Sequence, residues 1–138
     1  MIRPLADGYE LDDDFGRVDL AAVDRFLSEE SSWEQGRRRE TVERWSARPG
    51  ASSGSTATGA RSASPRAVTD GLSFVYLADV YVRPECRGRR LGVELVRELV
   101  ERGTYAGLKW MLHTADAHRL YERLGFGRPG EKVTERLP

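Results

Sequence analysis

Three arginines and two glycines lie within the six residues R-G-R-R-L-G, from Arg87 to Gly92. An extended apolar run precedes them and an amphipathic run follows them, so they occupy a predicted strand-to-helix junction. At such a junction the unpaired N–H groups of the first helical turn and the positive end of the helix dipole face the loop. Glycines at 88 and 92 would let the backbone approach a ligand closely, and the arginines add positive charge. These residues therefore predict an anion site, most suitably for a phosphate or pyrophosphate.

The loop lacks the motifs of two common nucleotide sites. No Gly-Lys-Ser/Thr follows its glycines, which disfavours a P-loop ATPase or GTPase. Gly-x-Gly-x-x-Gly does not occur in the loop, which disfavours a Rossmann dinucleotide site there. Composition alone leaves one alternative open, which is a solvated arginine loop in front of an ordinary helix.

Few other side chains are candidates for chemistry. Asp79 lies within an otherwise apolar run, where a carboxylate is costly unless it has a function or a partner. It is a candidate base, or it hydrogen-bonds a neighbouring loop. His113 and His118 have no third ligand at suitable spacing, so no metal site is predicted. Cys86 adjoins the arginine loop, but the sequence implies no histidine partner for it, so nucleophilic catalysis is not predicted.

The second half of the chain contains the elements that must position these residues. Residues 72–82 and 108–113 are apolar runs that predict two buried strands. Helical spacing of apolar residues predicts one helix from about residue 90 to 103 and another from Asp116 to Gly125, with Asp116 as its cap. Alternation of strand and helix implies an α/β sheet in which the two strands are roughly parallel neighbours.

The first half gives weaker signals. Residues 9–11 predict a short strand, and residues 19–27 and 37–47 predict two helices. The pattern then ends, because residues 48–66 contain no large apolar side chain and no periodicity. Their composition predicts a flexible linker or disordered loop that cannot form a buried strand.

Two stretches, "LADVYVRPECRGRRLGVELV" and "DAHRLYERLGF", resemble the GCN5-related N-acetyltransferases (GNAT), which use acetyl-coenzyme A (acetyl-CoA). The resemblance is firm over residues 72–126 and weaker over residues 9–45. It implies a single α/β domain over residues 1–138, with a mixed central sheet flanked by helices. The implied activity is transfer of an acetyl group from acetyl-CoA to an amine of a small molecule or protein. A catalytically weak or inactive acetyl-CoA-binding module is the alternative, and a phosphate-binding protein unrelated to coenzyme A is a third.

The resemblance also implies which residues bind the coenzyme. The family's loop signature, Arg/Gln-x-x-Gly-x-Gly/Ala, corresponds here to residues 87–92, whose backbone N–H groups would hold the pyrophosphate. Arg90 stands where the family usually has its central glycine, so its side chain could crowd the phosphates or its charge could compensate. Backbone groups of residues 80–82 would pair with the pantetheine arm. The implied binding residues are Val80, Tyr81, Val82, Arg87, Gly88, Arg89, Arg90, Leu91 and Gly92.

Tyr121 matches the family tyrosine that lies near the coenzyme sulfur and can protonate the leaving thiolate. A phenol is a suitable acid for a thiolate, because their ordinary pKa values are about 10 and 8.5. The alternative is a core tyrosine with a tethered hydroxyl, since Tyr121 lies on the apolar stripe of its helix. Asp79 is the candidate base for the acceptor amine. Asp116 lies near a position where the family often has a coenzyme-contacting asparagine.

The same resemblance leads us to expect a β-hairpin between the second helix and residue 72, where residues 48–66 predict irregular structure. Read one frame away, codons compatible with these residues permit two apolar runs around an Asp-Gly turn, which is a hairpin signature. We therefore also considered a pair of compensating frameshifts. A natural linker is the alternative.

Composition limits the remaining possibilities. The 138 residues include 22 basic and 22 acidic side chains, so the formal net charge is zero. That balance argues against a general nucleic-acid or membrane-surface binder, which would have a basic excess. Cys86 is the only cysteine, so no internal disulfide can form, and a cytoplasmic location is expected. No stretch of about 18 apolar residues is present. The sequence indicates neither the acceptor nor the oligomeric state.

Overall fold

The computed structural model describes residues 2–4, 8–12, 51–52, 55–58 and 60–138, and also residues 21, 25, 40 and 44. Ala21, Arg25, Glu40 and Arg44 are helical and exposed. The other residues of the two helices predicted at 19–27 and 37–47 lie outside the described residues. No helix in the described part of the chain is long and apolar enough to cross a membrane.

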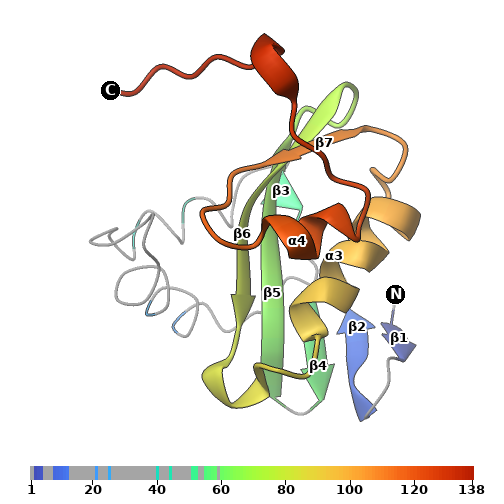
Figure 1. Ribbon diagram of the computed structural model, residues 1–138. Coiled ribbons are helices and arrows are strands. Elements are labelled where there is room, and N and C mark those ends of the chain that lie inside the picture. Colours follow the sequence, from blue (N-terminus) through green and yellow to red (C-terminus); the bar gives the residue numbers. More distant parts are fainter. Residues whose placement is uncertain are drawn as a thin grey trace.

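A single mixed sheet forms the centre of the described structure (Figure 1). Its strands are β1 (Ile2–Pro4), β2 (Glu10–Asp12), β3 (Ala51–Ser52), β4 (Ser55–Thr58), β5 (Ala60–Thr69), β6 (Phe74–Val82) and β7 (Lys109–Leu112). The order is β1-β2-β4-β5-β6-β7, with β3 also paired to β5. Only the β6–β7 pair among these is parallel. The predicted mixed sheet and its two parallel neighbours are confirmed, and β2 falls at the predicted first strand.

The irregular structure predicted for residues 48–66 is wrong where the structure describes that segment. Strands β3, β4 and β5 lie there, and β5 pairs antiparallel with both β4 and β6. The prediction required large apolar residues, but a strand needs only backbone partners and side chains that fit its surroundings. Ala63 and Ala67 of β5 are fully buried, so these two positions accommodate small side chains. The frameshift hypothesis assumed that this segment could not form a hairpin, and it loses that support.

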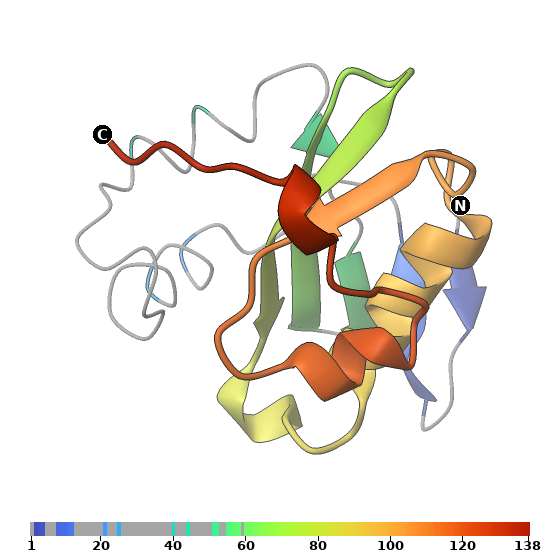
Figure 2. The same cartoon turned by 45° about the horizontal axis from the view of Figure 1, so that its top comes forward.

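Helix α3 (Leu91–Arg102) lies against one face of the sheet (Figure 2). Leu91, Leu95 and Val96 are buried, and the first two form a cluster with Ala63 and Tyr9. Because β5 presents alanine at this place, the larger leucines of α3 can lie directly over the strand. The helix begins and ends within one residue of the predicted positions.

The last helix, α4 (His118–Glu122), is shorter than predicted and is not capped by Asp116. Instead Ala117 stands at the cap position, and its backbone N–H donates to Thr114 Oγ1 at 3.0 Å. The hydroxyl of Thr114 reaches this N–H from the turn before the helix, which leaves Asp116 exposed. Gly125 has a φ of 86°, a left-handed conformation that ends the helical segment as expected.

Candidate active site

A β-bulge in β6 interrupts the regular alternation of its side chains between the two faces of the sheet. Arg66 pairs with Asp79 and Ala67 pairs with Leu77, so Ala78 is left over in the register with β5. Paired residues share a face of a sheet, and successive residues alternate. Leu77 therefore lies on the face of Ala67, whereas Asp79 lies on the opposite face with Arg66. A regular strand would have placed Leu77 and Asp79 on the same face.

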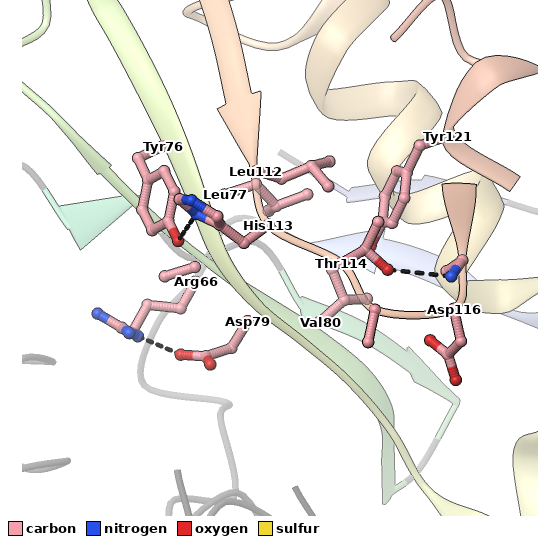
Figure 3. A pocket seen from close by; sticks show the side chains of 13 residues that line it. Arg66, Tyr76, Leu77, Asp79, Val80, Leu112, His113, Thr114, Asp116 and Tyr121 are labelled. Carbon is pink, nitrogen blue, oxygen red and sulfur yellow. Dashed lines mark hydrogen bonds and ion pairs between the residues drawn. The ribbon is translucent and has the colours of Figure 1, made fainter. Parts of the chain in front are cut away.

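A cavity of about 550 Å³ opens where the ladder between β6 and β7 ends, at Leu77 and Leu112. Its walls come from four parts of the chain (Figure 3). These are Arg66 of β5, residues 76–80 of β6, residues 112–117 and Tyr121 of α4. A cavity of this size is typical of small-molecule sites.

Asp79 is 5% exposed, and its Oδ2 accepts from Arg66 Nε at 2.5 Å. The structure thus supplies the partner that a buried carboxylate requires. Both residues line the cavity, so the carboxylate is close to any occupant. Its predicted role as the base stays a prediction.

Tyr121 lines the cavity from α4, away from the Arg66–Asp79 pair (Figure 3). Its ring makes an edge contact with Phe126, with ring centroids 5.7 Å apart, which fixes its orientation. Burial, and to a smaller extent the charge of Asp116, raises the pKa of the Tyr121 phenol above its ordinary value. The hydroxyl therefore remains protonated at neutral pH, as a proton donor must be.

The first two arginines of the loop each hydrogen-bond a residue outside the loop. A 3-10 turn, Pro84–Cys86, follows β6, and Arg87 Nε donates to the carbonyl oxygen of Val82 at 3.3 Å. Arg89 Nη1 donates to the Tyr9 hydroxyl at 3.1 Å. Gly88 has a φ of 79°, so this loop position uses the freedom of glycine.

Arg90 caps α3 in the left-handed conformation, with φ 61° and ψ 12°, and makes no side-chain capping hydrogen bond. This is the position where the sequence departs from the family's glycine. Gly92 allows close packing, because a β-carbon there would lie 3.2 Å from Val82 Cγ2 and 3.6 Å from Val80 Cγ1. The first turn of α3 therefore lies directly against the end of β6, with three exposed arginines around it.

The other predicted binding residues lie beside the cavity and loop. Val80, Tyr81 and Val82 pair with Pro65, Ser64 and Ala63 of β5. The parallel ladder between β6 and β7 ends at Leu77, before this stretch begins. Leu91 is buried in the cluster under α3 and serves packing. The cavity thus adjoins residues 76–80 of β6, and the exposed arginines follow the end of the same strand.

Sequence reasoning missed a second polar group in the cavity. The Tyr76 hydroxyl lies 2.7 Å from His113 Nδ1, and His113 Nε2 lies 3.1 Å from Glu135 Oε2. Tyr76 is one of several aromatic residues in an apolar run, so the sequence does not distinguish it from a core residue. Glu135 is distant along the chain, in an irregular segment. His113 was considered only as a metal ligand, and among the described residues no cluster suits a metal ion. The available signal was the position of His113 at the end of a predicted strand.

Comparison with known families agrees with this geometry. Residues 19–126, most of the chain, match the family described as "Acetyltransferase (GNAT) family". The chain belongs to the GNAT family. A GNAT-family protein from Xanthomonas campestris pv. campestris is 28% identical with a TM-score of 0.86, covering 99% of this chain and 95% of that chain. The resemblance inferred from the loop and from the tyrosine segment is confirmed.

Two N-acetyltransferases whose names state a substrate share the fold at lower identity. An aminoglycoside N-acetyltransferase, solved in complex with CoA, is 16% identical with a TM-score of 0.65, covering 97% of this chain and 99% of that chain. The ribosomal-protein-S18-alanine N-acetyltransferase from Escherichia coli is 19% identical with a TM-score of 0.67, covering 86% of this chain and 77% of that chain. A sequence search of curated proteins found no match. The family therefore indicates acyl transfer, and the acceptor is a separate question.

Proposed function

We propose that this GNAT protein transfers an acetyl group from acetyl-CoA to an amine of a small molecule or protein. The observation that carries the proposal is the cavity at the end of the β6–β7 ladder, which Asp79 and the protonated phenol of Tyr121 both line. The family match and the solved CoA complex of a structural neighbour support acetyl-CoA as the donor. A cytoplasmic location belongs to the same proposal and is supported by the single cysteine.

The arginine loop and the first turn of α3 would bind the pyrophosphate. Backbone N–H groups of the first helical turn point out of the helix, where the helix dipole favours negative charge. Arg87 and Arg89 keep their guanidinium groups near the loop through their contacts with Val82 and Tyr9. The pantetheine arm would follow residues 80–82 toward the cavity.

Acetyl-CoA, when bound, supplies the acetyl group as an activated thioester. Tyr121 would donate its phenolic proton to the leaving sulfur, which makes coenzyme A a better leaving group. Asp79 would add negative charge to the cavity and so favour an acceptor that arrives as an ammonium ion. Such an ammonium ion must lose one proton before its nitrogen can attack, and Asp79 is the base that the sequence predicts.

An acetyl-CoA-binding module without useful turnover is the second candidate. Arg90 favours it, since a side chain stands where the family has glycine and the strained backbone of that residue adjoins the proposed pyrophosphate site. Calorimetric titration with acetyl-CoA, followed by thiol release in the presence of amines, separates the candidates. Suitable amines are an aminoglycoside, spermidine, lysine and a peptide with an N-terminal alanine.

We expect acetyl-CoA to bind and at least one amine class to be acetylated. Gly92→Val is the matched test of the site, because its side chain would collide with Val82 and Val80 beside the loop. Gly107→Val is the control, since nothing lies within 4 Å of a β-carbon at that position. Binding without turnover on every amine would select the binding module. Absence of binding in the wild-type protein would reject both candidates.

A further inference from the structure

A chain of three polar side chains leads out of the proposed active site. The Tyr76 hydroxyl and His113 Nδ1 are 2.7 Å apart, and both residues line the cavity. On its other side the imidazole meets Glu135 through Nε2, at 3.1 Å. Strand pairing explains the first contact, because Tyr76 is opposite Met111 and His113 lies two residues beyond Met111 on the same face.

Glu135 determines how protons are arranged along this chain. An ionised carboxylate accepts hydrogen bonds and cannot donate them, so Nε2 of His113 carries a proton toward Glu135. In the neutral imidazole, Nδ1 is then an acceptor, and Tyr76 donates its hydroxyl proton to it. The lone pairs of the Tyr76 oxygen remain available to accept a hydrogen bond from an occupant of the cavity.

The surroundings of Tyr76 keep its hydroxyl neutral. The bulge in β6 places Asp79 and its partner Arg66 on the same face as Tyr76. Burial is the largest influence on the Tyr76 pKa and raises it. The charge of Asp79 raises it further, that of Arg66 lowers it, and that of Glu135 raises it. A neutral phenol can receive one proton while it passes on another, as a relay requires.

We infer that Tyr76 and His113 carry the proton away from the acceptor amine, and that Glu135 positions the imidazole. The inference rests on the proposed acetyltransferase function. One N–H bond of the acceptor ammonium breaks, and its proton moves to the Tyr76 oxygen. The original hydroxyl proton of Tyr76 moves to His113 Nδ1, which yields an imidazolium beside Glu135 and leaves a neutral amine able to attack the thioester. The side chain of His113 is 60% exposed, so the imidazolium can return its proton to water.

This route places proton removal and proton donation at different parts of one cavity. Tyr121 approaches from α4, whereas Tyr76 lies one residue before the end of the β6–β7 ladder and His113 one residue after it (Figure 3). The attacking nitrogen and the leaving sulfur are different substituents of the reacting carbon, so separate acid and base groups can serve them at the same time. The role of Asp79 is then charge, and Asp79→Asn should reduce turnover less than Tyr76→Phe.

The test uses the best amine from the panel above, with three variants of the full chain. Tyr76→Phe and His113→Ala should each lower kcat by about 10²-fold while the Kd for acetyl-CoA stays unchanged. Free imidazole should restore much of the rate in His113→Ala, because the vacated position is open to solvent. His118→Ala, an exposed histidine outside the cavity, should show neither the loss nor the rescue.

Glu135→Gln tests the positioning role. It should lower kcat in the wild-type background, with unchanged melting temperature and unchanged KM for acetyl-CoA. In the His113→Ala background it should have no further effect, because Glu135 would act only through the imidazole. Glu131→Gln, an exposed carboxylate of the same C-terminal segment, is the control.

The outcomes separate the inference from the function on which it rests. Full activity in His113→Ala, or a loss that imidazole does not restore, overturns the proton route while the acetyltransferase proposal stands. An effect of Glu135→Gln that persists in the His113→Ala background overturns the positioning role. A wild-type protein that binds acetyl-CoA but acetylates no amine of the panel overturns the proposed function, and the proton route with it.

Discussion

Arg90→Gly should make the protein more stable, because it removes a strained residue without removing a capping contact. Arg90 is the one non-glycine residue of the described chain with a positive φ, at 61°. It is exposed, and it makes no side-chain capping hydrogen bond to α3. An L-residue in this conformation costs roughly 1–2 kcal/mol relative to the right-handed region, because its β-carbon crowds the following carbonyl oxygen.

Glycine would recover most of that energy, but it also makes the unfolded chain more flexible, which costs about 0.4–1 kcal/mol. The difference leaves a gain of about 0.5–1 kcal/mol in the free energy of unfolding. For a domain of this size such a gain raises the melting temperature by about 2–4 °C. The gain belongs to the backbone, so it should not depend on the charge of the side chain.

Arg90→Ala is the matched control, because it removes the same guanidinium but keeps the β-carbon. Thermal unfolding should therefore place the glycine variant above the alanine variant by about the same 2–4 °C. Titration with acetyl-CoA then separates charge from crowding. A loss of affinity common to both variants would measure the charge, and a difference between them would measure the β-carbon. Equal melting temperatures for the two variants would refute the assignment of strain to Arg90.

Three further predictions concern the acid, the core and a turn. Tyr121→Phe should lower turnover by about 10²-fold or more with little change in acetyl-CoA binding. Because the pKa of the wild-type Tyr121 phenol is raised, the wild-type rate should not fall through deprotonation of this phenol below about pH 10. Leu95→Ala, at a side chain 1% exposed, should lower the free energy of unfolding by about 2–5 kcal/mol in denaturant titration. Asp70 accepts hydrogen bonds from Ser73 and Leu72, and these bonds lower the pKa of its carboxyl group. The ionised carboxylate therefore stabilises the fold above the ordinary pKa of about 4, and this stabilisation is lost as the pH falls below that value. Asp70→Asn should flatten the pH dependence of the melting temperature below about pH 4, and an unchanged acid profile would contradict the role of this turn.

The elements around the loop could be predicted because their signals are strong and local. Apolar residues recur at helical spacing from Leu91 onward, and glycine marks the end of α3 at residue 103. Strands β6 and β7 are apolar runs of different lengths separated by that helix, which implies parallel neighbours. The loop between them then had to lie at the start of α3, so its place in the fold followed from the order of elements.

Strand β5 could not be predicted from composition, because its stability comes from neighbours that are distant along the chain. Val68 is the only large apolar residue of β5 and is exposed, yet the small residues Ala63 and Ala67 are fully buried under other elements. The hydrogen-bonded series of Tyr76, His113 and Glu135 was missed for a related reason. Its contacts depend on which residues of β6 and β7 are paired, and on where the C-terminal segment passes, and neither is encoded in local spacing.

The bulge at Ala78 explains how one strand serves both the core and the proposed active site. Before the bulge, Val75 and Leu77 face the core. After it, Val80 and Val82 lie next to α3, because a β-carbon at Gly92 would contact both of them. Strict alternation would put Asp79 on the core face together with Val75 and Leu77. The extra residue instead moves Asp79 to the face of Tyr76 and Arg66, where the carboxylate finds its partner. A carboxylate in an apolar strand thus marks the place where the strand leaves regular geometry, and the cavity that carries the proposed chemistry opens at that same place.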